Sequence, residues 1–227
     1  MAEHLQREIR EMKKAILEIG AVVEESLHKA VKALQERDEK LAKSVIDNDV
    51  EIDHMEVDME EECLKVLALH QPVASDLRLI VSILKINNDL ERIGDLAVNI
   101  AERAAFLATQ NAIDIPLDFP LMAEKTKAML RKSLDALVNG DSRLAYEVCA
   151  ADDEVDAINR QMYLQVQDAI RRHPDRVESL IHLLSVSRHM ERIADHATNI
   201  AEDVIYMTEG EIVRHRTEDY PSQSRRV

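Results

Sequence analysis

The sequence contains few of the residues that turn or break a chain. Only four glycines and five prolines occur in 227 residues, tryptophan is missing, and aromatic residues make up 3%. Alanine, leucine, isoleucine, valine, methionine, glutamate and lysine dominate instead, a composition typical of long helices. At this length the chain forms one large domain or two of about a hundred residues, and either is long enough to bury a hydrophobic core.

Several functional classes are disfavoured by what the sequence lacks. No run of about 18 apolar residues is present, so no membrane span is predicted, and the charged segment Met1–Lys14 is unlike a signal peptide. The sequence has no glycine-rich phosphate loop, Ser/His/Asp arrangement or Cys/His cluster, so no enzymatic activity is predicted. The excess of 44 acidic over 29 basic residues disfavours binding to nucleic acids and anionic membranes and favours cations or a basic partner surface.

The two cysteines give no sign of a redox or metal site. Cys63 and Cys149 lack CxxC spacing and stand at non-equivalent places in the internal repeat described below. We expect both to be reduced, buried side chains in a cytoplasmic protein.

Hydrophobic periodicity predicts six helices in an all-α fold. Apolar residues recur at three- and four-residue spacing, and Asp38 and Asp141 stand where helix N-caps are needed. Breaks are expected at His70–Asp76, Asn139–Gly140 and His173–Pro174. The predicted helices cover Leu5–Glu36, 39–70, 75–110, the segment up to Val138, 142–172, and a last segment up to Glu209 that Gly210 ends.

The six helices fall into two similar halves. Leu34, Asp38 and Asp49 align with residues 103 positions later, and after the second break the offset is 100. The three-residue difference falls in a turn, where deletions are tolerated. We therefore predict two tandem three-helix bundles, at residues 1–112 and 113–210, followed by a mobile tail at 211–227.

The most informative motif is a duplicated polar stripe. Residues Glu91–Glu102 and Glu191–Glu202 are identical at nine of twelve positions, and both keep Glu, Asp, Asn and Glu at offsets 0, +4, +8 and +11. On a helix of about 3.6 residues per turn this series forms one continuous stripe. The second helix of each half adds an Asp-x-x-x-Asp pair: Asp49 and Asp53, then Asp152 and Asp156.

These carboxylates have two interpretations. On a helical wheel the second-helix aspartates lie about 60–100° from the centre of the apolar stripe, whereas Glu91 and Asp95 lie about 130–170° from theirs, on the outer face. Acidic residues there need no special explanation, and Arg92 and Arg103 could pair with them. However, four carboxylates on adjacent helices repel one another unless a cation compensates. Because oxygen ligands suit Mg²⁺, Mn²⁺, Ca²⁺ or iron, we predict one metal site per half.

The histidines do not strengthen the metal prediction. His196 follows Asp195, but its counterpart in the first half is Leu96. The other histidines without a counterpart are His54, His70, His182 and His189, and we expect all five to be core or surface residues rather than ligands.

The twin halves resemble the PhoU family of phosphate-specific transport accessory proteins. The resemblance is carried by the Asp-x-x-x-Asp pairs and by Glu-Arg-Ile-x-Asp at Glu91–Asp95 and Glu191–Asp195, and it extends from about Leu5 to Gly210. It implies a cytoplasmic all-α protein, often a homodimer, that negatively regulates the phosphate-starvation response. The implied partners are the ATPase subunit of the phosphate ABC transporter and the sensor histidine kinase, between which the protein acts as an adaptor.

The resemblance also implies surface metal clusters, of iron in some members and of other ions such as Mg, Mn or Zn in others. Eight carboxylates occupy the corresponding positions: Asp49, Asp53, Glu91, Asp95, Asp152, Asp156, Glu191 and Asp195. The stripe is extended by Asn99, Glu102, Asn199 and Glu202, which are secondary candidates.

Two other interpretations stay open. A metal-free helical scaffold fits the same composition. A carboxylate-bridged di-metal enzyme of the ferritin-like kind is disfavoured because such sites use Glu-x-x-His motifs. Here Gly94 and Ala194 stand three residues after Glu91 and Glu191.

Overall fold

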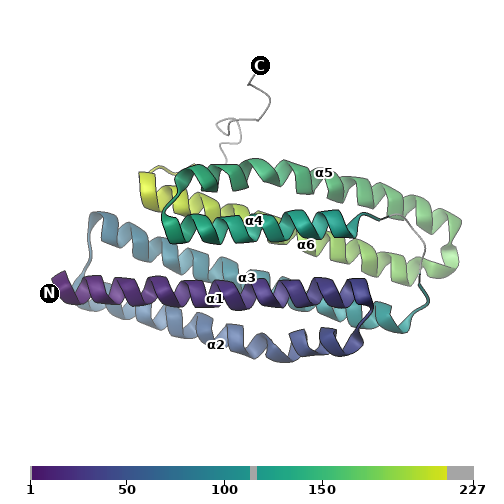
Figure 1. Ribbon diagram of the computed structural model, residues 1–227, viewed down its shortest axis with the longest axis horizontal. Helices are drawn as coiled ribbons and strands as arrows, with labels where there is room; N and C mark the ends of the chain where they lie inside the picture. The colour runs from purple at the N-terminus through teal and green to yellow at the C-terminus, as the bar shows by residue number, and fades with distance from the viewer. Residues whose placement is uncertain (1, 113–116, 214–227) are drawn as a thin grey trace, which may run out of the picture.

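The computed structural model describes residues 2–112 and 117–213, and within these ranges the chain is built of six long α-helices (Figure 1). A short 3-10 helix, η1 (Pro174–Arg176), precedes the last of them. The predicted all-α fold is therefore confirmed. The helices are α1 (Ala2–Glu36), α2 (Glu39–His70), α3 (Ala74–Thr109), α4 (Phe119–Asn139), α5 (Ser142–Arg172) and α6 (Val177–Glu209).

The helix ends lie where the sequence places its capping residues. The Asp38 carboxylate accepts hydrogen bonds from the backbone N–H groups of Lys40 (2.9 Å) and Leu41 (3.0 Å), which satisfies donors that the first turn of α2 leaves unpaired. Asp141 caps α5 in the same way. Gly140 (φ 60°) and Gly210 (φ 76°) end α4 and α6 in the left-handed conformation, which costs glycine little.

The helices form two three-helix bundles that pack together as two layers. In Figure 1, α4, α5 and α6 lie above α1, α2 and α3. The layers meet mainly through α3 and α6, and α1 also contacts α4, whereas α2 and α5 contact only helices of their own bundle within the described residues. Lys85 near the start of α3 reaches Asp203 near the end of α6, and Phe106 stacks on His182. These contacts show that α3 and α6 run antiparallel.

One large hydrophobic core extends through both bundles, and a small second cluster of Val166, Ala169 and Leu180 lies between α5 and α6. Side chains from all six helices belong to one continuous buried cluster. On α3 the buried face is wider than the single apolar stripe that the sequence predicts, because it includes Asn87, Asp89, Gly94 and Leu96. The reason is tertiary: α3 packs against α1, α2 and α6 together, so it is covered on three sides.

Parts of the predicted organisation lie outside the described residues. Residues 113–116 of the connector and 214–227 of the tail belong to this group, so the tail prediction stays a prediction. Cys63 and Cys149 are buried thiols that form no disulfide with each other, and burial raises the pKa of the Cys63 thiol to about 12. None of the described helices combines the length and the apolarity needed to cross a membrane.

Candidate functional site: two clusters of carboxylates

The first acidic cluster consists of Asp49 and Asp53 on α2 together with Glu91 and Asp95 on α3. The close approach of the two helices is permitted by Gly94, which lies between the two α3 carboxylates. A Cβ atom at that position would lie 3.1 Å from the Ile52 Cδ1 atom and 3.7 Å from the Asp49 Oδ1 atom. The structure therefore brings the predicted pairs of this half to the same interhelical seam.

The carboxylates of this cluster act on one another electrostatically. Burial raises the pKa of Asp49, and the charges of Asp53 and Asp95 raise it further. Burial likewise raises the pKa of Glu91, with a further increase from Asp95 that the Arg92 guanidinium partly offsets. Burial is the larger cause of both shifts, and the neighbouring carboxylates add to it.

The second acidic cluster consists of Asp152 and Asp156 on α5 together with Glu191 and Asp195 on α6. Burial raises the pKa of Asp152 from 3.8 to about 7, and the Asp195 and Asp156 charges contribute in the same direction. The pKa values of Glu191 and Asp195 are also raised, first by burial and then by neighbouring carboxylates. In both halves, therefore, burial raises the pKa of the first aspartate of the pair and of the glutamate.

Arginines compensate part of this charge. Arg92 lies 3.2 Å from the Asp95 carboxylate and 3.4 Å from that of Glu91, and Arg160 lies 3.2 Å from Asp156. These pairs are formed within one helix and are largely exposed, so each contributes little stability. In the first cluster Arg92 pairs with two of the four carboxylates, and in the second Arg160 pairs with one. The Arg188 and Arg192 charges also lower the pKa of Glu191, but they do not cancel the increase that burial causes.

Six of the eight carboxylates are half-buried, whereas Asp53 and Asp195 are exposed. The Glu91 side chain is only 22% exposed and that of Asp95 is 42% exposed, because Glu91 stands at the margin of the wide buried face of α3, next to α2. The predicted outer-face position is therefore wrong for Glu91. Among the described residues, no three aspartate, glutamate, histidine or cysteine side chains converge closely enough to form a ready-made metal site.

The residues that extend the polar stripe beyond the two clusters have different contacts in the two halves. The Asn99 side chain donates to the Asp95 backbone carbonyl (2.8 Å), whereas the Asn199 side chain donates to Asp89 in the other half (3.2 Å). Glu102 pairs with Arg103 (2.8 Å), whereas Glu202 is buried. The secondary candidates therefore play different parts in the two halves.

Sequence reasoning missed a polar contact between the halves. The His196 Nδ1 atom lies 2.7 Å from a carboxylate oxygen of Asp89, which is buried in the α3–α6 interface. The sequence gives little sign of this contact, because Asp89 follows Asn87 and Asn88 in a polar stretch of the helix. His196 is thus a packing residue between the halves, as the unmatched repeat position suggested, and its proximity partly offsets the raised pKa of Asp195.

A second missed contact recurs in both halves with different residues. Asn87 donates to the backbone carbonyl of Glu56 (2.9 Å), and Ser187, its counterpart in the second half, donates to Asn159 (2.6 Å). Asn159 in turn is the counterpart of Glu56. A polar pair therefore joins the second and third helices beside each cluster, although the sequence repeat preserves neither residue.

Comparison with known proteins identifies relatives along nearly the whole chain. The family model described as PhoU domain matches residues 16–104 and again residues 119–204. The phosphate-specific transport system accessory protein PhoU homolog of Aquifex aeolicus is 41% identical over 210 residues, which cover 92% of this chain and 95% of that protein. The homolog from Pseudomonas aeruginosa is 35% identical over 95% of this chain and 89% of its own length.

Solved structures give the same result. The crystal structure of PhoU from Pseudomonas aeruginosa superposes with a TM-score of 0.89 at 35% identity, covering 91% of this chain and 99% of that chain. The phosphate transport system regulatory protein PhoU from Streptococcus pneumoniae superposes with a TM-score of 0.82 at 29% identity, covering 92% of this chain and 99% of that one. With two matched domains and relatives of this identity, the chain belongs to the PhoU family, whose members are phosphate-specific transport system accessory proteins.

Proposed function

We propose that this protein is a cytoplasmic, non-enzymatic negative regulator of the phosphate-starvation response. In this role it is an adaptor that contacts the ATPase subunit of the phosphate ABC transporter and the sensor histidine kinase, and it works as a homodimer. The observation that carries the proposal is the near full-length match to proteins named as accessory or regulatory components of phosphate transport. The duplicated acidic clusters would give the adaptor one acidic surface in each three-helix bundle.

Deletion in the native host tests the regulatory role. Without the protein the kinase loses its inhibitory input, so we expect constitutive alkaline phosphatase activity in phosphate-rich medium. A pull-down with the transporter ATPase and the cytoplasmic part of the kinase, at high and low phosphate, tests the adaptor role directly. Normal repression in the deletion strain, or failure to retain either partner at any phosphate concentration, would contradict the proposal.

Metal ions at the two acidic clusters form a further part of the proposal. The eight predicted carboxylates would supply oxygen ligands to a hard cation such as Mg, Mn or Fe, or to Zn. The support is electrostatic: burial, and after it the charges of neighbouring carboxylates, raise the pKa values of Asp49, Glu91 and Asp152, and a bound cation would favour their ionised forms. Binding would draw the carboxylates of α2 and α3, or of α5 and α6, toward one ion.

The paired substitution Glu91→Ala/Asp95→Ala tests the first metal site. We expect it to lower the metal content of purified protein by about half, because the second cluster is left intact, and to change the free energy of unfolding of the metal-free protein by no more than about 0.5 kcal/mol. Elemental analysis of the two proteins measures the difference. The matched variant Glu60→Ala/Glu61→Ala removes two exposed acids from α2 outside the predicted ligand set and should keep the wild-type metal content.

A metal-free scaffold is the second candidate function. It is favoured by the pairs that Arg92 and Arg160 form with cluster carboxylates. Equal metal content in the wild-type protein and the Glu91→Ala/Asp95→Ala variant would support the scaffold and remove the proposed site.

A further inference from the structure

A groove with an apolar floor runs along the seam between α1 and α2. It encloses about 290 Å³, and its floor is formed by Met12, Ala15, Ile19, Met55 and Met59. Ala15 and Met55 are partly exposed at the surface of the floor, and the other three side chains are buried beneath them. None of the carboxylates of the first acidic cluster lines the groove, so the two sites are separate.

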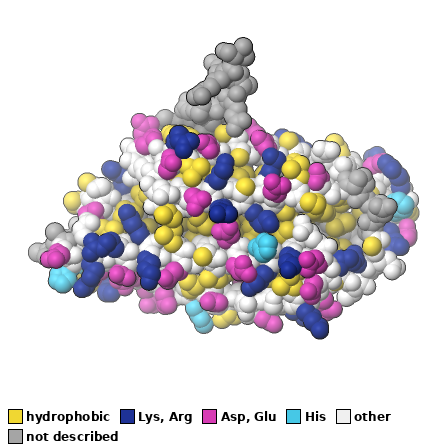
Figure 2. Space-filling model, viewed as in Figure 1, with side chains coloured by type: hydrophobic (Ala, Val, Ile, Leu, Met, Phe, Trp, Pro, Cys, Tyr) yellow, Lys and Arg dark blue, Asp and Glu magenta, His cyan; other side chains and the backbone are white. Residues whose placement is uncertain are grey.

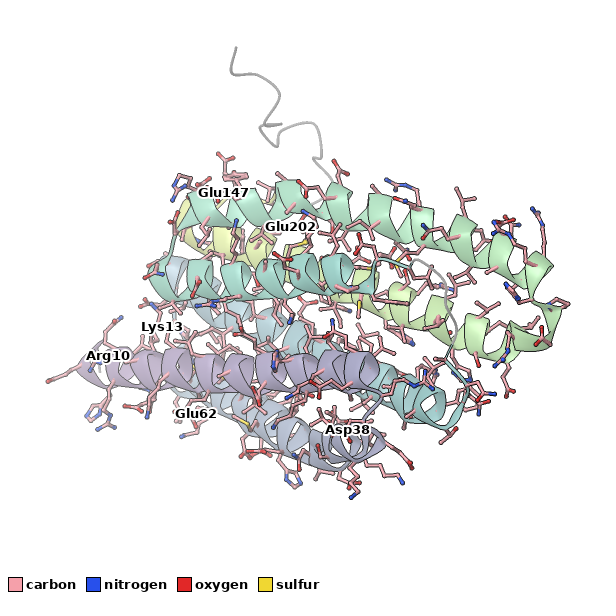
Figure 3. The ribbon with its side chains drawn as sticks, turned by 45° about the vertical axis from the view of Figure 1, so that its right-hand side comes forward. Arg10, Lys13, Asp38, Glu62, Glu147 and Glu202 are labelled. Carbon is pink, nitrogen blue, oxygen red and sulfur yellow. The ribbon has the colours of Figure 1, made fainter. Side chains whose placement is uncertain are left out.

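Carboxylates stand along both edges of this groove. Glu11 and Glu18 of α1 face Asp58 and Glu62 of α2 across the floor, and Figure 3 labels Glu62 on α2 beside α1. An adjoining hollow of about 300 Å³ continues the seam, with Val22, Val45 and Ile52 among its apolar lining. Its edges add Glu25 and Glu51, so both helices carry acids seven residues, or about two turns, apart.

Lysines neutralise only part of these edges. Lys14, Lys29 and Lys65 lie 3.5, 3.3 and 2.8 Å from Glu18, Glu25 and Glu62, each within its own helix. Exposed pairs of this kind are weak, and their long lysine side chains are readily displaced. With three lysines against six carboxylates the groove stays acidic. Elsewhere the charges are mixed: Figure 2 shows acidic and basic side chains interspersed over the face that carries α1 and α4.

Most of the acidic edge residues are not repeated in the second half of the chain. At the offset of 103 residues, Asp58 and Glu62 correspond to Gln161 and Gln165 on α5, and Glu18 corresponds to Leu121 on α4. The apolar floor, by contrast, has counterparts such as Met162 for Met59. Glu25 likewise corresponds to Ala128, whereas Glu51 corresponds to the acidic Glu154. The packing is therefore duplicated, but four of the six edge carboxylates have uncharged counterparts in the second half.

We propose that this groove binds a basic amphipathic helix of a protein partner. An apolar stripe on such a helix would cover the floor, where methionines adapt their shape to the side chains they meet. Lysines or arginines flanking the stripe would reach the carboxylates on either edge. The distance from Glu11 to Glu25 corresponds to about 21 Å of helix, enough for about four turns of a partner. The inference goes beyond the adaptor role and does not depend on metal binding.

Binding of a designed peptide to the full-length protein tests the proposal. The probe is a fluorescent helical peptide of about 16 residues, with a leucine stripe flanked by lysines, followed by fluorescence anisotropy. We expect Asp58→Asn/Glu62→Gln, which reproduces the uncharged state of the second half, to raise Kd about tenfold. The matched variant Glu124→Gln/Asp135→Asn removes the same charge from exposed positions on α4 and should change Kd by less than about twofold.

Two further measurements separate groove binding from general charge attraction. A peptide of the same composition with its leucines scattered around the helix should bind at least about tenfold more weakly, because it cannot cover the floor. Ala15→Lys, which places a bulky cation on the floor, should weaken binding of the original peptide. Equal Kd values for the two double variants, or for the two peptides, would overturn the proposal whether or not the protein regulates the phosphate response.

Discussion

Replacing Leu90 by alanine is expected to lower the free energy of unfolding by about 2–5 kcal/mol. The side chain is fully buried on α3, the helix that packs against α1, α2 and α6. Because helices on three sides hold the surrounding side chains in place, the cavity left by the missing atoms closes only in part. Urea unfolding followed by circular dichroism measures the change.

Leu64→Ala is the matched control for this substitution. The same leucine-to-alanine substitution is made at Leu64 on α2, where the side chain is 53% exposed. Leucine and alanine have similar helix propensity, so the comparison isolates burial, and the control should stay within about 0.5 kcal/mol of the wild type. A loss at Leu90 no larger than that at Leu64 would show that α3 is not held between its three neighbours.

Asp152→Asn is expected to stabilise the metal-free protein at neutral and alkaline pH. The pKa of Asp152 in the folded state is about 7, compared with 3.8 for an ordinary aspartate. A raised pKa means that the protonated carboxyl favours folding at low pH, and that this contribution is lost as the pH rises from about 4 to about 7. The shift corresponds to roughly 4 kcal/mol at 1.36 kcal/mol per pKa unit, and solvent screening of this partly exposed group reduces the expected gain to about 1–2 kcal/mol.

The pH dependence provides the diagnostic measurement. The stability advantage of Asp152→Asn should be near zero at pH 4, grow between pH 4 and 7, and stay constant above pH 7. Asp153→Asn makes the same change at the neighbouring exposed position and should lack this profile. A divalent cation that binds the second cluster should stabilise the wild type and reverse the order of the two proteins. An advantage independent of pH in metal-free buffer would contradict the raised pKa.

Local chemistry explains why the helix boundaries were predictable. Asp38 and Asp141 each supply an oxygen to unpaired N–H groups, and Gly210 adopts a left-handed conformation that other residues rarely take. These requirements act over a few residues, so a single sequence is enough to reveal them. The proximity of α2 to α3 followed from the short connection between them.

The pairing of α3 with α6 was not predictable in the same way. Hydrophobic periodicity identifies one apolar face, but it does not say that polar residues such as Asp89 and Asn87 are buried as well. Asp89 is accommodated because His196 and Asn199 come from a helix a hundred residues away. The same tertiary contact widened the buried face of α3, whereas the neighbouring α2 left Glu91 less exposed than its helical-wheel position indicated.

The broad buried face of α3 has a consequence for assembly. A single repeat, separated from the other, would present to water the ridge that α6 covers in the intact chain, and it would have to find a second copy to cover it. Joining two repeats in one polypeptide makes that encounter intramolecular, at an effective concentration set by the connector rather than by expression level. The two three-helix bundles therefore stay packed together whatever the concentration of the protein in the cell.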